Sequence, residues 1–143
     1  MLTFNRHSGF EIDRKLEADS HPICWLGLCE LRLIDDRRWP WVVLVPQRNG
    51  VKELHELTPL DQTMMTFETN EVAEALCAVT DCDKINRGTL GNIVSQLHYH
   101  IVARNAGDPN WPGPIWGYGV REPYRGEERA AFCERLKNQL AQN

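Results

Sequence analysis

Long hydrophobic runs are missing from this sequence. No apolar stretch in its 143 residues approaches the roughly 20 residues that an α-helix needs to cross a bilayer. Residues 1–7 also lack the apolar core of a secretory signal peptide. We therefore expect a cytoplasmic protein without a membrane partner.

Concentrated positive charge is missing as well. Lys and Arg number 16 against 20 Asp and Glu, which gives a net charge of −4, and basic residues never stand more than two in a row. Proteins that hold the backbone of DNA or RNA without regard to sequence need a basic surface. We therefore expect no nucleic-acid polymer as a partner, although a few local donors could hold a single nucleotide.

Motifs typical of a metal centre or a disulfide framework are absent too. The sequence contains neither His-Glu-x-x-His nor Cys-x-x-Cys, and its five cysteines are widely spaced and odd in number. In a reducing compartment such cysteines are small core residues. We expect neither a metal nor another cofactor.

The composition of the chain is that of one globular domain that spans residues 1–143, with 42% hydrophobic and 25% charged residues.

Ser8 and Glu11 have the spacing of a capping box, which predicts a first helix over 8–19. Thr58 followed by Pro59 predicts the start of a long helix that ends near residue 79, and a third helix is predicted over 126–142. Strands are predicted at 23–26, 28–34, 42–46, 84–87 and from 97 onward. This order predicts an α+β fold, an antiparallel sheet of about five strands with helices on one face.

The most informative row of residues lies in the last predicted strand. Side chains alternate between the two faces of a strand, so Gln96, His98 and His100 share one face. Three interpretations compete: an exposed strand face, a metal site, and phosphorus chemistry in which a neutral imidazole attacks. The missing metal motifs weaken the second interpretation, and two of the five histidines in one row weaken the first.

The segment Gln-Leu-His-Tyr-His-Ile-Val, residues 96–102, resembles the signature of the histidine-triad (HIT) superfamily, His-φ-His-φ-His-φ-φ, where φ is apolar. Gln96 stands where the first histidine of that pattern would be. The resemblance is to small bacterial HIT-like proteins, and it extends over most of the chain. It implies the HIT fold and a homodimer.

The resemblance also implies a function, a nucleotide hydrolase or nucleotidyl transferase acting at the α-phosphorus of nucleoside phosphoramidates, dinucleoside polyphosphates or related conjugates. His98 takes the position of the nucleophile, which would form a nucleotidyl-histidine intermediate. Asp35 takes the ribose-binding position, with Asp36 as the fallback. Ile93 replaces a hydroxyl residue that helps the leaving group depart in family enzymes. The phosphate-binding positions are taken by His100, Gln96, Asn86, Gly91 and Asn92.

Two other functions stay open at this point. The departures at Gln96 and Ile93 are consistent with a catalytically weak module that binds or senses nucleotides. A metal-dependent enzyme that uses His98 and His100 as ligands is the second alternative. Trp111 and Trp116 lie in a Pro- and Gly-rich segment, 106–117, that could pack on the core, cover the ligand or meet a partner subunit.

Overall fold

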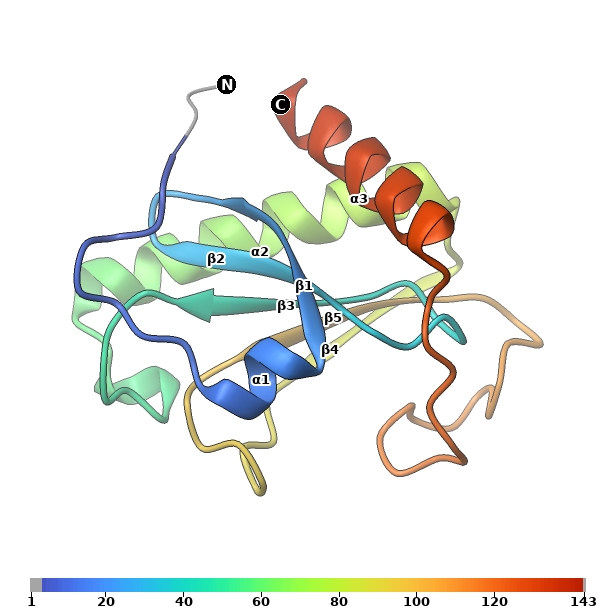
Figure 1. The fold of residues 1–143 in the computed structure, drawn as a ribbon, viewed down its shortest axis with the longest axis horizontal. Helices are drawn as coiled ribbons and strands as arrows, with labels where there is room; N and C mark the ends of the chain where they lie inside the picture. Colours follow the sequence, from blue (N-terminus) through green and yellow to red (C-terminus); the bar gives the residue numbers. More distant parts are fainter. Residues whose placement is uncertain (1–3, 143) are drawn as a thin grey trace.

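A five-stranded antiparallel sheet forms the centre of the computed structural model, which describes residues 4–142 (Figure 1). Its strands lie in the spatial order β1-β2-β3-β5-β4. Their bounds are β1 Ser20–Trp25, β2 Cys29–Ile34, β3 Trp41–Pro46, β4 Lys84–Gly88 and β5 Tyr99–Arg104. The predicted α+β fold is confirmed, and β5, which carries His100, is paired on both sides.

Three α-helices and one short 3₁₀ helix accompany the sheet: α1 Arg14–Ala18, η1 Leu54–Glu56, α2 Pro59–Thr80 and α3 Gly126–Ala141. The start of α2 is as predicted, because the Thr58 hydroxyl accepts the N–H of Asp61 at 3.1 Å and Pro59 is the first helical residue. Asp81 ends α2 in the left-handed conformation, with φ of 53°. None of the described helices is long and apolar enough to span a bilayer.

The predicted helix over 8–19 is wrong in extent. Only α1 is helical there, and its N-cap is Asp13, whose carboxylate accepts the N–H groups of Lys15 and Leu16. Gly9 has a φ of +80°, which breaks any helix at that point. Strand β1 begins at Ser20, three residues before the predicted strand at 23–26, because Ser20 pairs with Ile34 of the neighbouring strand.

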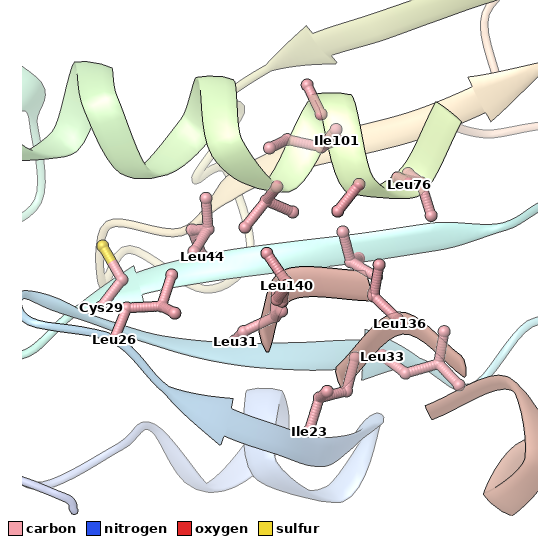
Figure 2. Packing of buried hydrophobic residues seen from close by; sticks show 14 of the residues in the cluster. Ile23, Leu26, Cys29, Leu31, Leu33, Leu44, Leu76, Ile101, Leu136 and Leu140 are labelled. Atoms are coloured by element: carbon pink, nitrogen blue, oxygen red, sulfur yellow. The ribbon is translucent and has the colours of Figure 1, made fainter. Parts of the chain in front are cut away.

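One face of the sheet is covered by α2 and α3, and we call it the helix face. Its buried side chains include Leu31, Leu33, Leu44 and Ile101. Figure 2 shows Leu76 of α2 and Leu136 and Leu140 of α3 packed against them. The Glu68 carboxylate of α2 also accepts the backbone N–H groups of Leu28 and Cys29, which joins the helix to the turn between β1 and β2.

The opposite face carries His100 and Arg104 of β5 with Val43 and Val45 of β3, and we call it the histidine face. The expectation that all helices lie on one face is wrong for α1, since Leu16 packs against Val43 and Val45. The reason is that the apolar run 42–46 is buried on both sides, as its lack of alternation indicated.

Segment 105–121 covers another part of the histidine face and contains no helix or strand. In Figure 1 it is the orange loop that follows β5. Arg104, whose side chain is 0% exposed, holds it to the sheet by pairing with Asp108 at 2.8 Å and donating to the carbonyl of Gly113. Ile115 packs with Trp39 and Val102 in a small core of its own. The space between this segment and α1 is where the candidate site lies.

Candidate active site

A cleft of about 660 Å³ opens on the histidine face between α1, the loop over 89–95 and segment 105–121. This volume is in the range of small-molecule sites. Aromatic rings of Trp41, Trp116 and Tyr118 line it together with Leu16 and Ile34. Its ionisable and imidazole side chains are Lys15, Asp19, Asp36, Arg38, His98, His100 and Arg121.

His98 lies one residue before β5, so the strand predicted from Leu97 begins two residues later than expected. Its Nδ1 is 2.7 Å from the backbone carbonyl oxygen of Gln96. A carbonyl only accepts hydrogen bonds, so Nδ1 must carry the proton and donate it. The neutral ring then has its lone pair on Nε2, the nitrogen that a nucleophile would use.

His100 lies inside β5 and is 5% exposed. Two indoles flank its ring, with centroid distances of 5.7 Å to Trp41 and 5.4 Å to Trp116. The Trp41 Nε1–H donates to His100 Nδ1 at 2.9 Å. Burial lowers the pKa of His100 to about 3, and the neighbouring His98, 4.8 Å away between ring centroids, acts in the same direction. His100 is therefore neutral at physiological pH.

Gln96 is predicted to share a strand face with the two histidines, but it lies before β5 and does not line the cleft. Its Oε1 accepts the N–H of Asp13 at 2.8 Å, and its Nε2 donates to the carbonyl of Glu11 at 2.9 Å. The amide therefore ties the loop before β5 to the N-terminal cap of α1. The structure brings His98 and His100 together and leaves the Gln96 side chain outside.

The predicted phosphate-binding loop does line the cleft through Gly91, Asn92 and Ile93. Gly91 has a φ of +71°, a conformation that other residues rarely adopt, so this position of the loop favours glycine. Ile93 is 83% exposed. Asn86 is in β4 outside the cleft, where its Oδ1 accepts a hydrogen bond from Arg104 at 3.0 Å.

The two candidate ribose residues occupy different places. The Asp35 carboxylate accepts the N–H of Tyr124 at 3.0 Å and lies 3.5 Å from His21 Nε2, away from the cleft lining. Asp36 lines the cleft and pairs with Arg38 at 2.7 Å. Of the two positions, only the fallback residue reaches the site.

Sequence reasoning missed several side chains of the cleft. Trp41 lies just before the predicted strand at 42–46, and its contact with His100 follows from the pairing of β3 with β5, in which Val43 lies opposite His100. Asp19 pairs with Lys15 at 2.9 Å and with Arg121 at 3.4 Å, and all three residues line the cleft. The i,i+4 spacing of Lys15 and Asp19 is a local pattern, whereas the contact of Asp19 with Arg121 joins residues 102 positions apart and leaves no local signal.

Trp111 and Trp116 have separate positions. Trp116 lines the cleft, whereas Trp111 lies over the Arg104 guanidinium at 5.5 Å from the ring centroid. Residues 4–142 contain no group of three or more His, Cys, Asp or Glu side chains arranged to hold a metal ion.

A comparison with protein families finds a HIT domain over residues 15–107. The chain belongs to the HIT family. A histidine triad (HIT) protein from Sinorhizobium meliloti is 57% identical, with a TM-score of 0.91, over 92% of this chain and 98% of that one. Histidine triad proteins from Marinobacter aquaeolei and Bradyrhizobium japonicum are 39% and 35% identical, each with a TM-score of 0.90. They cover 93% and 92% of this HIT protein and 97% and 98% of their own chains. A search of curated proteins gives no match.

Proposed function

We propose that this HIT protein is a nucleotide hydrolase or nucleotidyl transferase that acts at the α-phosphorus of its substrate. The substrate class is nucleoside phosphoramidates, dinucleoside polyphosphates or related nucleotide conjugates. The observation that carries the proposal is the hydrogen bond from His98 Nδ1 to the Gln96 carbonyl. It leaves Nε2 as a nucleophile in a cleft of nucleotide size.

The reaction has two steps. The lone pair of His98 Nε2 forms a bond to phosphorus while the bond from phosphorus to the leaving amine or phosphate breaks, and a leaving amine takes its proton from solvent. The ring then carries a positive charge, and the Gln96 carbonyl oxygen stabilises the Nδ1–H that bears part of it. Water, or an acceptor in a transferase, attacks phosphorus in the second step and releases the nucleotide from His98.

Phosphate oxygens are assigned to His100, to the backbone at Gly91 and to Asn92, all of which line the cleft. A glycine with positive φ lets backbone N–H groups approach an anion closely. Asn86 and Gln96 act from outside the cleft, since their amides hold Arg104 and the cap of α1.

The ribose is assigned to Asp36, because this residue lines the cleft whereas the Asp35 carboxylate accepts the Tyr124 N–H. A carboxylate suits vicinal hydroxyls because it accepts two hydrogen bonds at once. The Arg38 guanidinium, bound to both Asp36 oxygens, holds the group in place.

A catalytically weak nucleotide-binding or sensing module is the second candidate function, and one observation favours it. The Gln96 amide is engaged by Glu11 and Asp13, and Ile93 offers no proton donor at the cleft. Proton delivery to the leaving group would then depend on solvent. Such a module would bind nucleotides with the same residues and turn them over slowly.

A metal-dependent enzyme remains the third alternative. Both Nδ1 atoms of the histidine pair already have hydrogen-bond partners, so a metal would have to use the Nε2 atoms. Elemental analysis and activity after EDTA treatment test this alternative. Stoichiometric zinc bound by His98 would remove His98 as the nucleophile.

A homodimer is proposed from the resemblance, and the exposed surface is compatible with it. Strand β4 lies at the edge of the sheet, and the neighbouring α2 exposes Leu60 and Phe67. Exposed edge strands are usually covered or paired. Light scattering that gives a monomer mass at micromolar concentration would reject the dimer.

Rapid-quench mass spectrometry with a nucleoside phosphoramidate tests the main proposal. We expect a nucleoside monophosphate adduct on His98 and none on His100. His98→Ala should abolish measurable turnover while nucleotide binding is largely retained, because the Gly91 loop and His100 remain. Full activity in His98→Ala, or an adduct on His100, would overturn the assignment. Slow turnover without an adduct would favour the binding module.

A further inference from the structure

We propose that Trp41 is a positioning residue that fixes His100 in the Nε2–H tautomer, so that His100 presents a hydrogen-bond donor to the phosphate beside the nucleophile. The assignment of the phosphate rests on the proposed function, whereas the tautomer rests on geometry alone. Trp41 and His100 are brought together by the pairing of β3 with β5, although they lie 59 positions apart in the chain.

The hydrogen bond between the two rings decides the tautomer. Trp41 Nε1 lies 2.9 Å from His100 Nδ1. An indole nitrogen donates and cannot accept, so Nδ1 must offer its lone pair. In a neutral imidazole the proton is then on Nε2. A second proton on Nδ1 would place two N–H groups against each other.

The surroundings keep His100 in this neutral form. Trp116 meets the imidazole edge to face, with an interplanar angle of 79°, on a ring that Trp41 also contacts. The residue is 5% exposed, and its burial lowers its pKa to about 3. The hydrogen bond from Trp41 and the burial of the ring therefore both favour the neutral imidazole with its proton on Nε2.

His98 has the complementary state. Its Nδ1 faces a carbonyl oxygen, which requires a proton on Nδ1 and leaves a lone pair on Nε2. Two imidazoles 4.8 Å apart thus have opposite tautomers, one with a nucleophilic Nε2 and one with a donating Nε2–H. A phosphoryl group needs both, because its phosphorus accepts the lone pair and its oxygens accept hydrogen bonds. The other tautomer of His100 would direct a lone pair at an anionic oxygen.

Nitrogen NMR of the ligand-free protein with ¹⁵N-labelled histidine tests the tautomer directly. We expect the wild-type His100 signals to show an unprotonated Nδ1 and a protonated Nε2, with His100→Gln identifying the signals by their loss. Trp41→Phe keeps an aromatic ring but removes the donor, so both tautomers should become populated. A wild-type His100 with its proton on Nδ1 would overturn the proposal without any variant.

Two matched variants separate the hydrogen bond from packing. Trp39→Phe removes an indole N–H that donates to the Pro109 carbonyl in the same aromatic cluster. Trp116→Phe changes the other ring against His100, whose Nδ1 it does not bind. Both should keep the wild-type tautomer of His100. The same tautomer mixture in all three variants would show that Trp41 acts by packing alone, and would reject its positioning role.

Binding of AMP then tests whether His100 meets a phosphate. Trp41→Phe should weaken AMP binding by the factor by which the donating tautomer of His100 is depleted, about twofold if the two tautomers become equally populated. Adenosine, which lacks the phosphate, should bind both proteins equally. Equal AMP affinity in the two proteins would overturn the phosphate contact. Wild-type protein that binds AMP in this way but turns over no phosphoramidate would reject the proposed enzyme and leave the role of Trp41 intact.

Discussion

The two faces of the sheet are made by the same strands but are stabilised in different ways. On the helix face, Leu31, Leu33 and Leu44 are fully buried against two long helices. On the histidine face, Arg32 and Arg104 are buried as deeply, and each is held by a carboxylate, Glu30 and Asp108. Apolar packing tolerates substitutions that conserve volume, whereas a buried charge needs its particular partner.

Strand β5 shows the difference within six residues. Ile101 and Ala103 enter the core of the helix face, while His100 and Arg104 occupy the other side. The partners on the helix side are interchangeable methyl and methylene groups. Those on the histidine side are single atoms, such as Trp41 Nε1 and Asn86 Oδ1. The candidate site therefore lies on the face whose contacts are directional.

The largest expected effect on stability is at the helix face. Leu44→Ala removes a fully buried side chain and should lower the free energy of unfolding by about 2–5 kcal/mol, through lost burial and the cavity left behind. Guanidinium unfolding measures it. Val120→Ala is the control, since Val120 is 83% exposed, and should change stability by less than about 0.5 kcal/mol. Equal effects of the two substitutions would contradict the position of the core.

Arg104→Met tests the directional contacts of the histidine face. This substitution should lower the free energy of unfolding by about 3 kcal/mol. The Asp108 carboxylate and the Gly113 carbonyl lose the hydrogen bonds that Arg104 donates to them. Amide hydrogen exchange should also become faster across 105–121 than in the rest of the chain. Arg37→Met is the control, because its pair with Glu128 is exposed and worth about 0–1 kcal/mol. Unchanged exchange would show that other contacts hold the segment.

The substitutions Asp36→Asn and Asp35→Asn test which of the two aspartates binds the ribose. If Asp36 binds ribose, its substitution should weaken ribonucleotide binding by about 1.5–3 kcal/mol and narrow the gap to 2′-deoxyribonucleotides. Asp35→Asn should leave that gap unchanged, because Asp35 lies outside the cleft lining. Calorimetric titration with both nucleotide types decides between them. The reverse pattern would return the role to Asp35.

Acid should lower the stability of the protein in part through His100, which lies on the histidine face. Its pKa is about 3 in the folded protein against 6.5 in an unfolded chain, so the unfolded state binds more protons between these values. Stability is therefore unaffected above the unfolded pKa and falls as pH drops below it, by about 2 kcal/mol near pH 5. His100→Gln should remove this part of the decline. An identical pH dependence of unfolding in the two proteins would contradict it.

Elements with strong local signals were predictable. The start of α2 followed from Thr58 and Pro59, because capping involves atoms within one turn. The run 42–46 indicated a strand buried on both sides, and the structure places Leu44 on one face and Val43 on the other. The signal from Ser8 and Glu11 failed because Gly9 and long-range pairing of Ser20 outweighed a local capping pattern.

The candidate site was predictable only where its residues have a local sequence signal. The loop with Gly91 and Asn92 and the two histidines were found from sequence and resemblance, and all four residues line one cleft. The Gln96 side chain and Asn86 were placed by contacts with Glu11 and Arg104, which sequence spacing does not encode. These hydrogen bonds could not be predicted, because the residues that form them are far apart along the chain.

The sequence by itself determined that His98 and His100 would be displayed together, because alternation along an extended chain is a local property of the backbone. Only the tertiary structure decided what each imidazole can do. The tautomer of His100 depends on Trp41, and that contact exists because β3 and β5 pair with Val43 opposite His100. No hairpin turn joins β3 to β5, because α2 and β4 lie between them in the chain, so the register of this pair is set by burial in the folded sheet.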